Sequence, residues 1–181
     1  MRKKFLQLEN QFRLLCGFLL FPLFLILLMC RAGIQEYNFT GLLNLPRQGI
    51  YIKAMACMIL VWVLRTVWIL ACHRLQKTMS FRIRMILFTI FAIGAIVTPY
   101  VDGSFDATMH LFFSYGAAIF FNIMLYALYP VDNKIRTIYL AILFFCALLC
   151  VAEGKITGLS ELIYACMVSI LLSYDSKEND L

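Results

Sequence analysis

A row of small and polar residues recurs every four positions within one apolar stretch of the chain. The row consists of Asp106, His110, Ser114, Ala118 and Asn122. On a helix of about 3.6 residues per turn, positions four apart drift by only about 40° per step, so these side chains share one helix face. Asp106 and His110 can hydrogen-bond as i,i+4 neighbours. The row therefore predicts a helix face that lies against other helices and ends in an acid and an imidazole.

Two further carboxylates are expected near this pair. Asp102 precedes the row, and Glu161 enters the last apolar stretch at a similar depth. We predict that Asp102, Asp106, His110 and Glu161 form an outward-facing polar cluster able to hold a ligand. The alternative is structural: Asp106 caps the helix that starts at Ala107, and His110 is only its partner.

Metal chemistry at this cluster has little support in the sequence. A catalytic zinc ion usually needs three protein ligands, commonly histidines. The second histidine, His73, is expected at the opposite face of the membrane. We therefore predict no metal site, no catalytic residue and no cofactor.

A second polar pair is expected inside the apolar stretches themselves. Arg65 lies about two-thirds of the way through one stretch, and Asn122 lies at a matching depth in another. An arginine to amide contact would lower the cost of inserting a charge. The alternative is that Arg65 extends to the headgroups, seven residues or roughly 10 Å away at the helical rise.

The elements that must position these residues are membrane-spanning helices. The chain is 63% apolar and 14% charged, with a mean hydropathy of +0.86, against roughly 45–50% and 25% in soluble domains. Its charges separate apolar runs that match the thickness of a bilayer, which excludes a soluble globular protein. We predict an all-α, six-transmembrane-helix bundle, with residues 1–181 as one integral membrane domain. The predicted spans are residues 14–30, 50–72, 85–101, 107–129, 137–152 and 156–174.

The distribution of positive charge predicts the orientation of these spans. The net charge of +6 sits at span ends, which favours membrane orientation over nucleic-acid binding. With the N-terminus inside, eleven cations are cytoplasmic and four are external, so both termini are predicted to be cytoplasmic, in a plasma membrane or a bacterial inner membrane. The eleven are Arg2, Lys3, Lys4, Arg13, Arg74, Lys77, Arg82, Arg84, Lys134, Arg136 and Lys177. The four are Arg31, Arg47, Lys53 and Lys155.

The seven cysteines are interpreted as small buried hydrophobes, because free cysteine often packs in this way. Five of them lie inside the apolar runs, and Cys30 and Cys72 lie at run ends. The five are Cys16, Cys57, Cys146, Cys150 and Cys166.

One stretch resembles a known group of membrane proteins. Residues 98–102 read Thr-Pro-Tyr-Val-Asp, His110 follows, and residues 115–121 read Tyr-Gly-Ala-Ala-Ile-Phe-Phe. This arrangement resembles the Pro-x-x-Asp, spaced His, then Gly-Ala and Phe pattern of the six-helix DRAM/Sfk group and its bacterial relatives of unknown function. The resemblance covers about 25 residues and six spans. It implies a small membrane protein without established catalysis, in which Asp102, Asp106 and His110 form the polar mouth of the bundle.

Three functions are compatible with this chain. The favoured one is a noncatalytic membrane protein that binds a lipid, a small ligand or a membrane protein partner through the outer cluster. An alternative is the membrane-embedded substrate-binding subunit of a transporter, which suits the chain length and its six spans. A third is an enzyme acting on lipid. Membrane lipids are expected around every span, no nucleic acid is expected, and the oligomeric state is left open.

Overall fold

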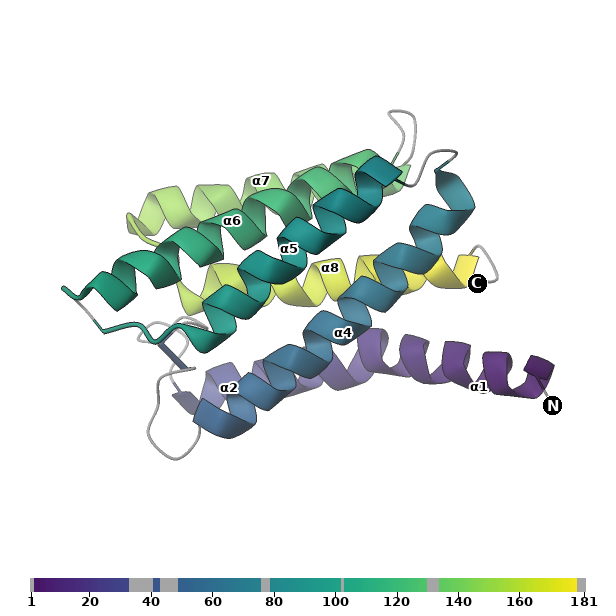
Figure 1. The fold of residues 1–181 in the computed structure, drawn as a ribbon, viewed down its shortest axis with the longest axis horizontal. Coiled ribbons are helices and arrows are strands. Elements are labelled where there is room, and N and C mark those ends of the chain that lie inside the picture. The colour runs from purple at the N-terminus through teal and green to yellow at the C-terminus, as the bar shows by residue number, and fades with distance from the viewer. Residues whose placement is uncertain are drawn as a thin grey trace. The chain divides into compact units, whose positions relative to one another are not determined.

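The computed structural model describes residues 2–32, 41–42, 49–75, 79–101, 103–129 and 134–178, and within these ranges the secondary structure is helical without a strand. This confirms the predicted all-α class for the described residues. The main elements (Figure 1) are α1 (Arg2–Leu15), the π-helical segment η1 (Cys16–Leu20), α2 (Phe21–Ala32), α4 (Gly49–Arg74), α5 (Met79–Val97), α6 (Phe105–Leu128), α7 (Lys134–Glu153) and α8 (Gly158–Glu178).

Six helical stretches of the described chain are long and apolar enough to cross a membrane, as the sequence predicts. Their lengths range from 19 to 26 residues, close to the roughly 20 residues that a bilayer requires. They are Gln7–Cys30, Gly49–Arg74, Met79–Val97, Phe105–Leu128, Lys134–Glu153 and Gly158–Lys177.

Several helices extend past the predicted span limits. The first helical stretch starts near the N-terminus rather than at residue 14, the third starts at Met79 rather than residue 85, and the last continues to Glu178 rather than stopping at 174. Arginine, lysine and glutamate are good helix formers, so a charge limits burial in lipid without ending a helix. The third helix ends at Val97, earlier than predicted, because Pro99 disfavours a helical conformation at the residue before it.

The chain divides into two compact units, which are described separately. Unit 1 comprises Met1–Asn38 and Asp132–Leu181, and unit 2 comprises Phe39–Val131. In unit 1, α8 packs against α1, η1 and α2 on one side and against α7 on another. In unit 2, α5 and α6 form a tight antiparallel hairpin, and α4 packs mainly on α5.

A proline and a π-helical turn shape the first helix of unit 1. In η1 the Phe21 N–H donates to Cys16 O, five residues back. Pro22 has no N–H to donate. Gly17 O is therefore deprived of the donors that would normally lie four or five residues ahead of it. The hydroxyl of Ser169, on α8, donates to this carbonyl at 2.9 Å, and both residues are buried.

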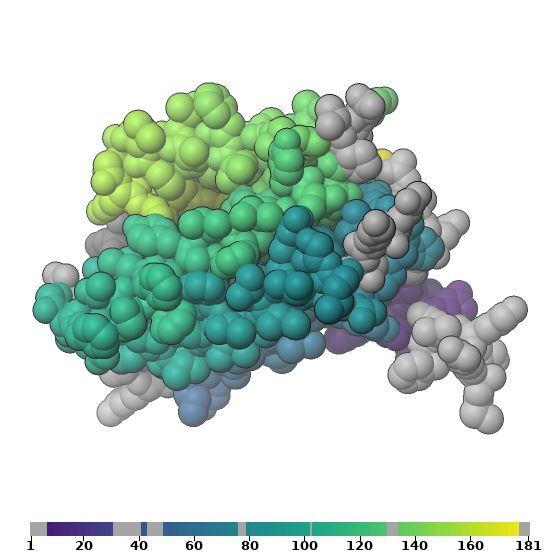
Figure 2. All heavy atoms as spheres, turned by 45° about the horizontal axis from the view of Figure 1, so that its top comes forward, coloured from purple at the N-terminus to yellow at the C-terminus, as the bar shows by residue number. Residues whose placement is uncertain are grey.

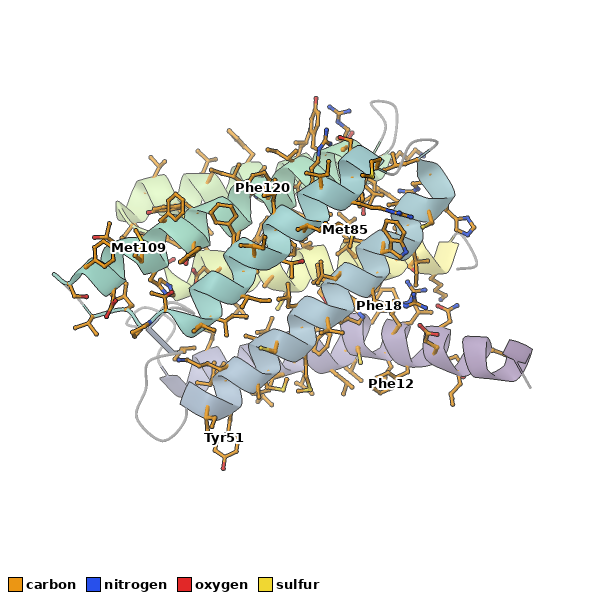
Figure 3. All side chains as sticks on the ribbon, in the orientation of Figure 1. Phe12, Phe18, Tyr51, Met85, Met109 and Phe120 are labelled. Atoms are coloured by element: carbon orange, nitrogen blue, oxygen red, sulfur yellow. The ribbon has the colours of Figure 1, made fainter. Side chains whose placement is uncertain are left out.

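In the α5–α6 hairpin, each helix packs a phenylalanine ring against a glycine of the other helix. A Cβ at Gly94 of α5 would lie 2.5 Å from the ring of Phe113 of α6, and a Cβ at Gly116 of α6 would overlap the ring of Phe91 of α5. Phe91 also packs against Phe120 at a centroid distance of 5.4 Å. Figure 3 labels Phe120 on α6, and Figure 2 shows the side chains of α5 and α6 lying side by side. The glycines thus let two aromatic-rich helices approach closely.

Candidate functional site

The side chain of His110, on α6, makes a hydrogen bond to the backbone just after α5. Its side chain is only 1% exposed, and its Nδ1 lies 2.8 Å from Thr98 O. A carbonyl oxygen can only accept, so Nδ1 carries the proton in this bond. The Tyr100 ring meets the imidazole edge-on at a centroid distance of 5.9 Å. Because Thr98 lies just past the last residue of α5, this bond ties the exit of one helix to the first turns of the next.

The N-cap of α6 is Ser104, so the structural alternative in which Asp106 caps this helix is wrong. Ser104 Oγ accepts from Ala107 N at 3.1 Å and donates to Val101 O at 2.6 Å. Gly103, with φ 74°, allows the tight turn that places this hydroxyl. The cap therefore lies two residues earlier than the alternative proposed.

Asp106 lies in the first turn of α6 and is exposed. A carboxylate is favourable there because the unpaired N–H groups make the N-terminus of a helix electropositive. His110 directs its Nδ1 to Thr98 rather than to Asp106. The joint action of Asp106 and His110 as one site stays a prediction, and Asp102 lies outside the described residues.

Glu161 lies in the first turn of α8, in unit 1, and is half-buried. The turn before it is a reciprocal cap: Ser160 N–H donates to Thr157 Oγ1 at 3.3 Å, and Thr157 N–H donates to Ser160 Oγ at 3.2 Å. Asp106 and His110 belong to unit 2. The approach of Glu161 to them therefore stays a prediction.

The two residues of the second predicted pair both lie in unit 2. Arg65 is exposed on α4. Asn122, on α6, is half-buried and donates from its side-chain amide to Ala118 O, one turn back, at 2.7 Å. This local bond satisfies one donor of the amide. The pairing of Arg65 with Asn122 stays a prediction.

Sequence reasoning missed a buried polar layer in unit 1. Arg13 is 5% exposed and donates to Asn10 Oδ1 at 2.7 Å. Asp175 is fully buried, as is Ser176, and Ser173 is 1% exposed. The sequence model placed Arg13 at the border of a span and Asp175 in a polar tail, whereas both lie inside helical stretches of membrane length.

The register of α8 on the first helical stretch places Ser173 at the level of Arg13. The bond from Ser169 to Gly17 fixes the register. In an antiparallel pair, one turn back from Gly17 leads to Arg13, and one turn on from Ser169 leads to Ser173. Asp175, about 200° further round α8, lies on another face of that helix. The serine spacing along the last span was the signal that could have indicated this layer, because buried intramembrane polar groups face other helices.

The exposure of each cysteine depends on which helix face a neighbouring helix covers, and not on how apolar the surrounding sequence is. Cys16 and Cys146 are buried, as predicted, and all seven cysteines are free. Cys30, Cys57 and Cys72 are exposed, so for these three the prediction is wrong. A position inside an apolar run does not determine which face another helix covers.

Among the described residues, no three His, Cys, Asp or Glu side chains are grouped so that they could hold a metal ion. Comparisons with protein-family models, with curated proteins and with solved structures found no match to this chain. The likeness of residues 98–121 to the DRAM/Sfk group therefore stays a prediction based on those residues alone.

Proposed function

We propose that this chain is a noncatalytic integral membrane protein that spans the bilayer six times, with both termini in the cytoplasm, and binds a lipid, a small ligand or a partner protein at its outer end. The six apolar helices support the spans, and the bias of lysine and arginine supports the orientation. The plasma membrane or a bacterial inner membrane is the proposed location, and kinship with the DRAM/Sfk group is part of this proposal.

The observation that carries the proposed binding end is a hydrogen-bonded but exposed segment between α5 and α6. His110 ties the turn to α5, and Ser104 caps α6. Around these contacts Val101 is 56% exposed, Phe105 is 74% exposed, and Asp106 is exposed. The hydrogen bonds of His110 and Ser104 reduce the conformational entropy that their side chains would lose on binding. Apolar and acidic side chains on such a turn suit a ligand or partner that carries a cation beside an apolar group.

A photo-crosslinking experiment tests this proposal. Benzoylphenylalanine replaces Phe105 in membranes of the expressing cell, and a matched probe replaces Phe144, which is 65% exposed on α7. We expect one adduct of discrete mass at position 105, weakened by Asp106→Asn, and a mixture of bulk lipids at position 144. The same mixture of lipids at both positions would contradict a binding site at this turn.

A further inference from the structure

The end of unit 2 opposite the α5–α6 turn holds arginines stacked on aromatic rings. Here α4 ends, α5 begins and α6 ends. The guanidinium carbon of Arg82 lies 5.0 Å from the Trp68 ring centroid, and that of Arg74 lies 5.4 Å from the Tyr129 ring centroid. These two arginines, their two aromatic partners and Arg84 are together called the basic end.

The basic end contains no acidic residue of its own unit. Between residues 39 and 131 the sequence has two acids: Asp102, which falls between α5 and α6 in the sequence, and Asp106, which lies in the first turn of α6 at the other end of the hairpin. Arg82 is exposed, and Arg84 is half-buried. Within unit 2 the arginines of the basic end therefore have no carboxylate beside them, which favours an anion.

Stacking leaves the donors of Arg82 available. A cation–π contact uses the flat face of the guanidinium group, whereas its N–H donors point outward in the plane of the group. The planar group can donate two parallel hydrogen bonds to the oxygens of one phosphate. Because Trp68 already restrains the side chain, less rotamer freedom is lost when an anion binds.

Exposed apolar residues lie on both sides of Arg82 along one face of α5. Met79 and Ile86 lie three residues before and four residues after Arg82, on the same helix face, and Ile90 continues that face. Met79 is 67% exposed, Ile86 59% and Ile90 55%. Figure 3 labels Met85, which lies nearly one turn along α5 from Arg82. A cation beside exposed apolar residues matches an amphiphile that has an anionic head.

We propose that the basic end binds the phosphate of an anionic phospholipid through Arg82, with the acyl chains lying along Ile86 and Ile90. This inference rests on the proposed membrane orientation, which places the basic end at the cytoplasmic leaflet, where anionic lipids are concentrated. Free phosphate would bind the arginines but would make no contact with the apolar residues Ile86 and Ile90.

Trp68 provides a direct test, because it is one of two tryptophans in the chain. In a Trp62→Phe background, the protein is reconstituted in phosphatidylcholine vesicles that contain a small, fixed fraction of brominated lipid. Brominated phosphatidylglycerol should quench Trp68 more strongly than brominated phosphatidylcholine with the same acyl chains. Arg82→Gln should lower this lipid preference roughly fivefold, the loss expected for one arginine near a membrane surface.

Controls separate this inference from the proposed function. Lys155→Gln removes the same charge from an exposed position in unit 1 and should leave the preference unchanged. Excess glycerol phosphate should not compete with the lipid. Competition would show that the basic end binds a free phosphate, and it would overturn the proposal of an amphiphilic ligand. Equal quenching by both lipids would overturn this inference alone. Absence of quenching by either lipid would overturn the membrane placement as well. Circular dichroism confirms that each variant keeps its helical content.

Discussion

At the scale of single residues, two side chains complete backbone hydrogen bonding where a helix is interrupted. Ser169 donates to Gly17 O beside the π-helical turn, and His110 donates to Thr98 O beyond the end of α5. A carbonyl that is shielded from water needs a donor from the protein. These two bonds join residues 152 and 12 positions apart in the chain.

Ser169→Ala should destabilise unit 1 by about 1–2 kcal/mol, because Gly17 O is left without its donor. Ser173→Ala is the matched control, since Ser173 donates to Ser169 O within its own helix, where that carbonyl belongs to the helical ladder. We expect a smaller loss for the control. The measurement is the free energy of unfolding in mixed micelles, and equal losses would show that the bond to Gly17 has no special role.

Variants of His110 test its bond to Thr98. His110→Ala should destabilise the α5–α6 hairpin by about 1–3 kcal/mol, the range for a buried acceptor left without a partner. The amide nitrogen of Asn takes nearly the place of Nδ1, whereas that of Gln takes the place of Nε2. His110→Asn should therefore recover more stability than His110→Gln in thermal unfolding monitored by circular dichroism. Equal behaviour of the two variants would argue against the Nδ1 contact.

At the scale of elements, the α5–α6 hairpin depends on two glycines that receive phenylalanine rings. Gly116→Ala forces its new methyl group into Phe91, and overpacking of this kind costs typically about 1–3 kcal/mol. A second substitution, Phe91→Leu, should relieve that strain. It should not relieve Gly94→Ala, whose methyl group meets Phe113 instead. Unfolding free energies of the single and double variants measure this coupling. Additive effects for Gly116 and Phe91 would contradict the close packing.

At the scale of the whole molecule, the bias of positive charge makes a topology prediction. Alkaline phosphatase fused after Gly103, between α5 and α6, should be active outside the cytoplasm. The same enzyme fused after Leu75, between α4 and α5, should be inactive, and a fluorescent protein placed there should be bright. A fluorescent fusion at the C-terminus should also be bright. An active phosphatase after Leu75 would reverse the orientation and move the basic end to the outer leaflet.

The sequence by itself determined the class of the fold and the number of membrane-length helices. Apolar length and helical propensity are local properties, and lipid requires that each spanning segment satisfy its own backbone. The helix limits were less well predicted, because a charged residue ends an apolar run without ending a helix. Arg13, Arg82 and Asp175 all lie inside helices.

The partners of the polar side chains were decided only by the tertiary structure. Asp106 and His110 have the spacing of a pair, yet the imidazole bonds Thr98, because Pro99 ends α5 and brings that carbonyl over the first turns of α6. Ser169 appears in the sequence as an ordinary serine in an apolar run. Its role follows from a proline in another helix and from the register that brings the two helices together, and neither can be deduced from the periodicity of a single segment.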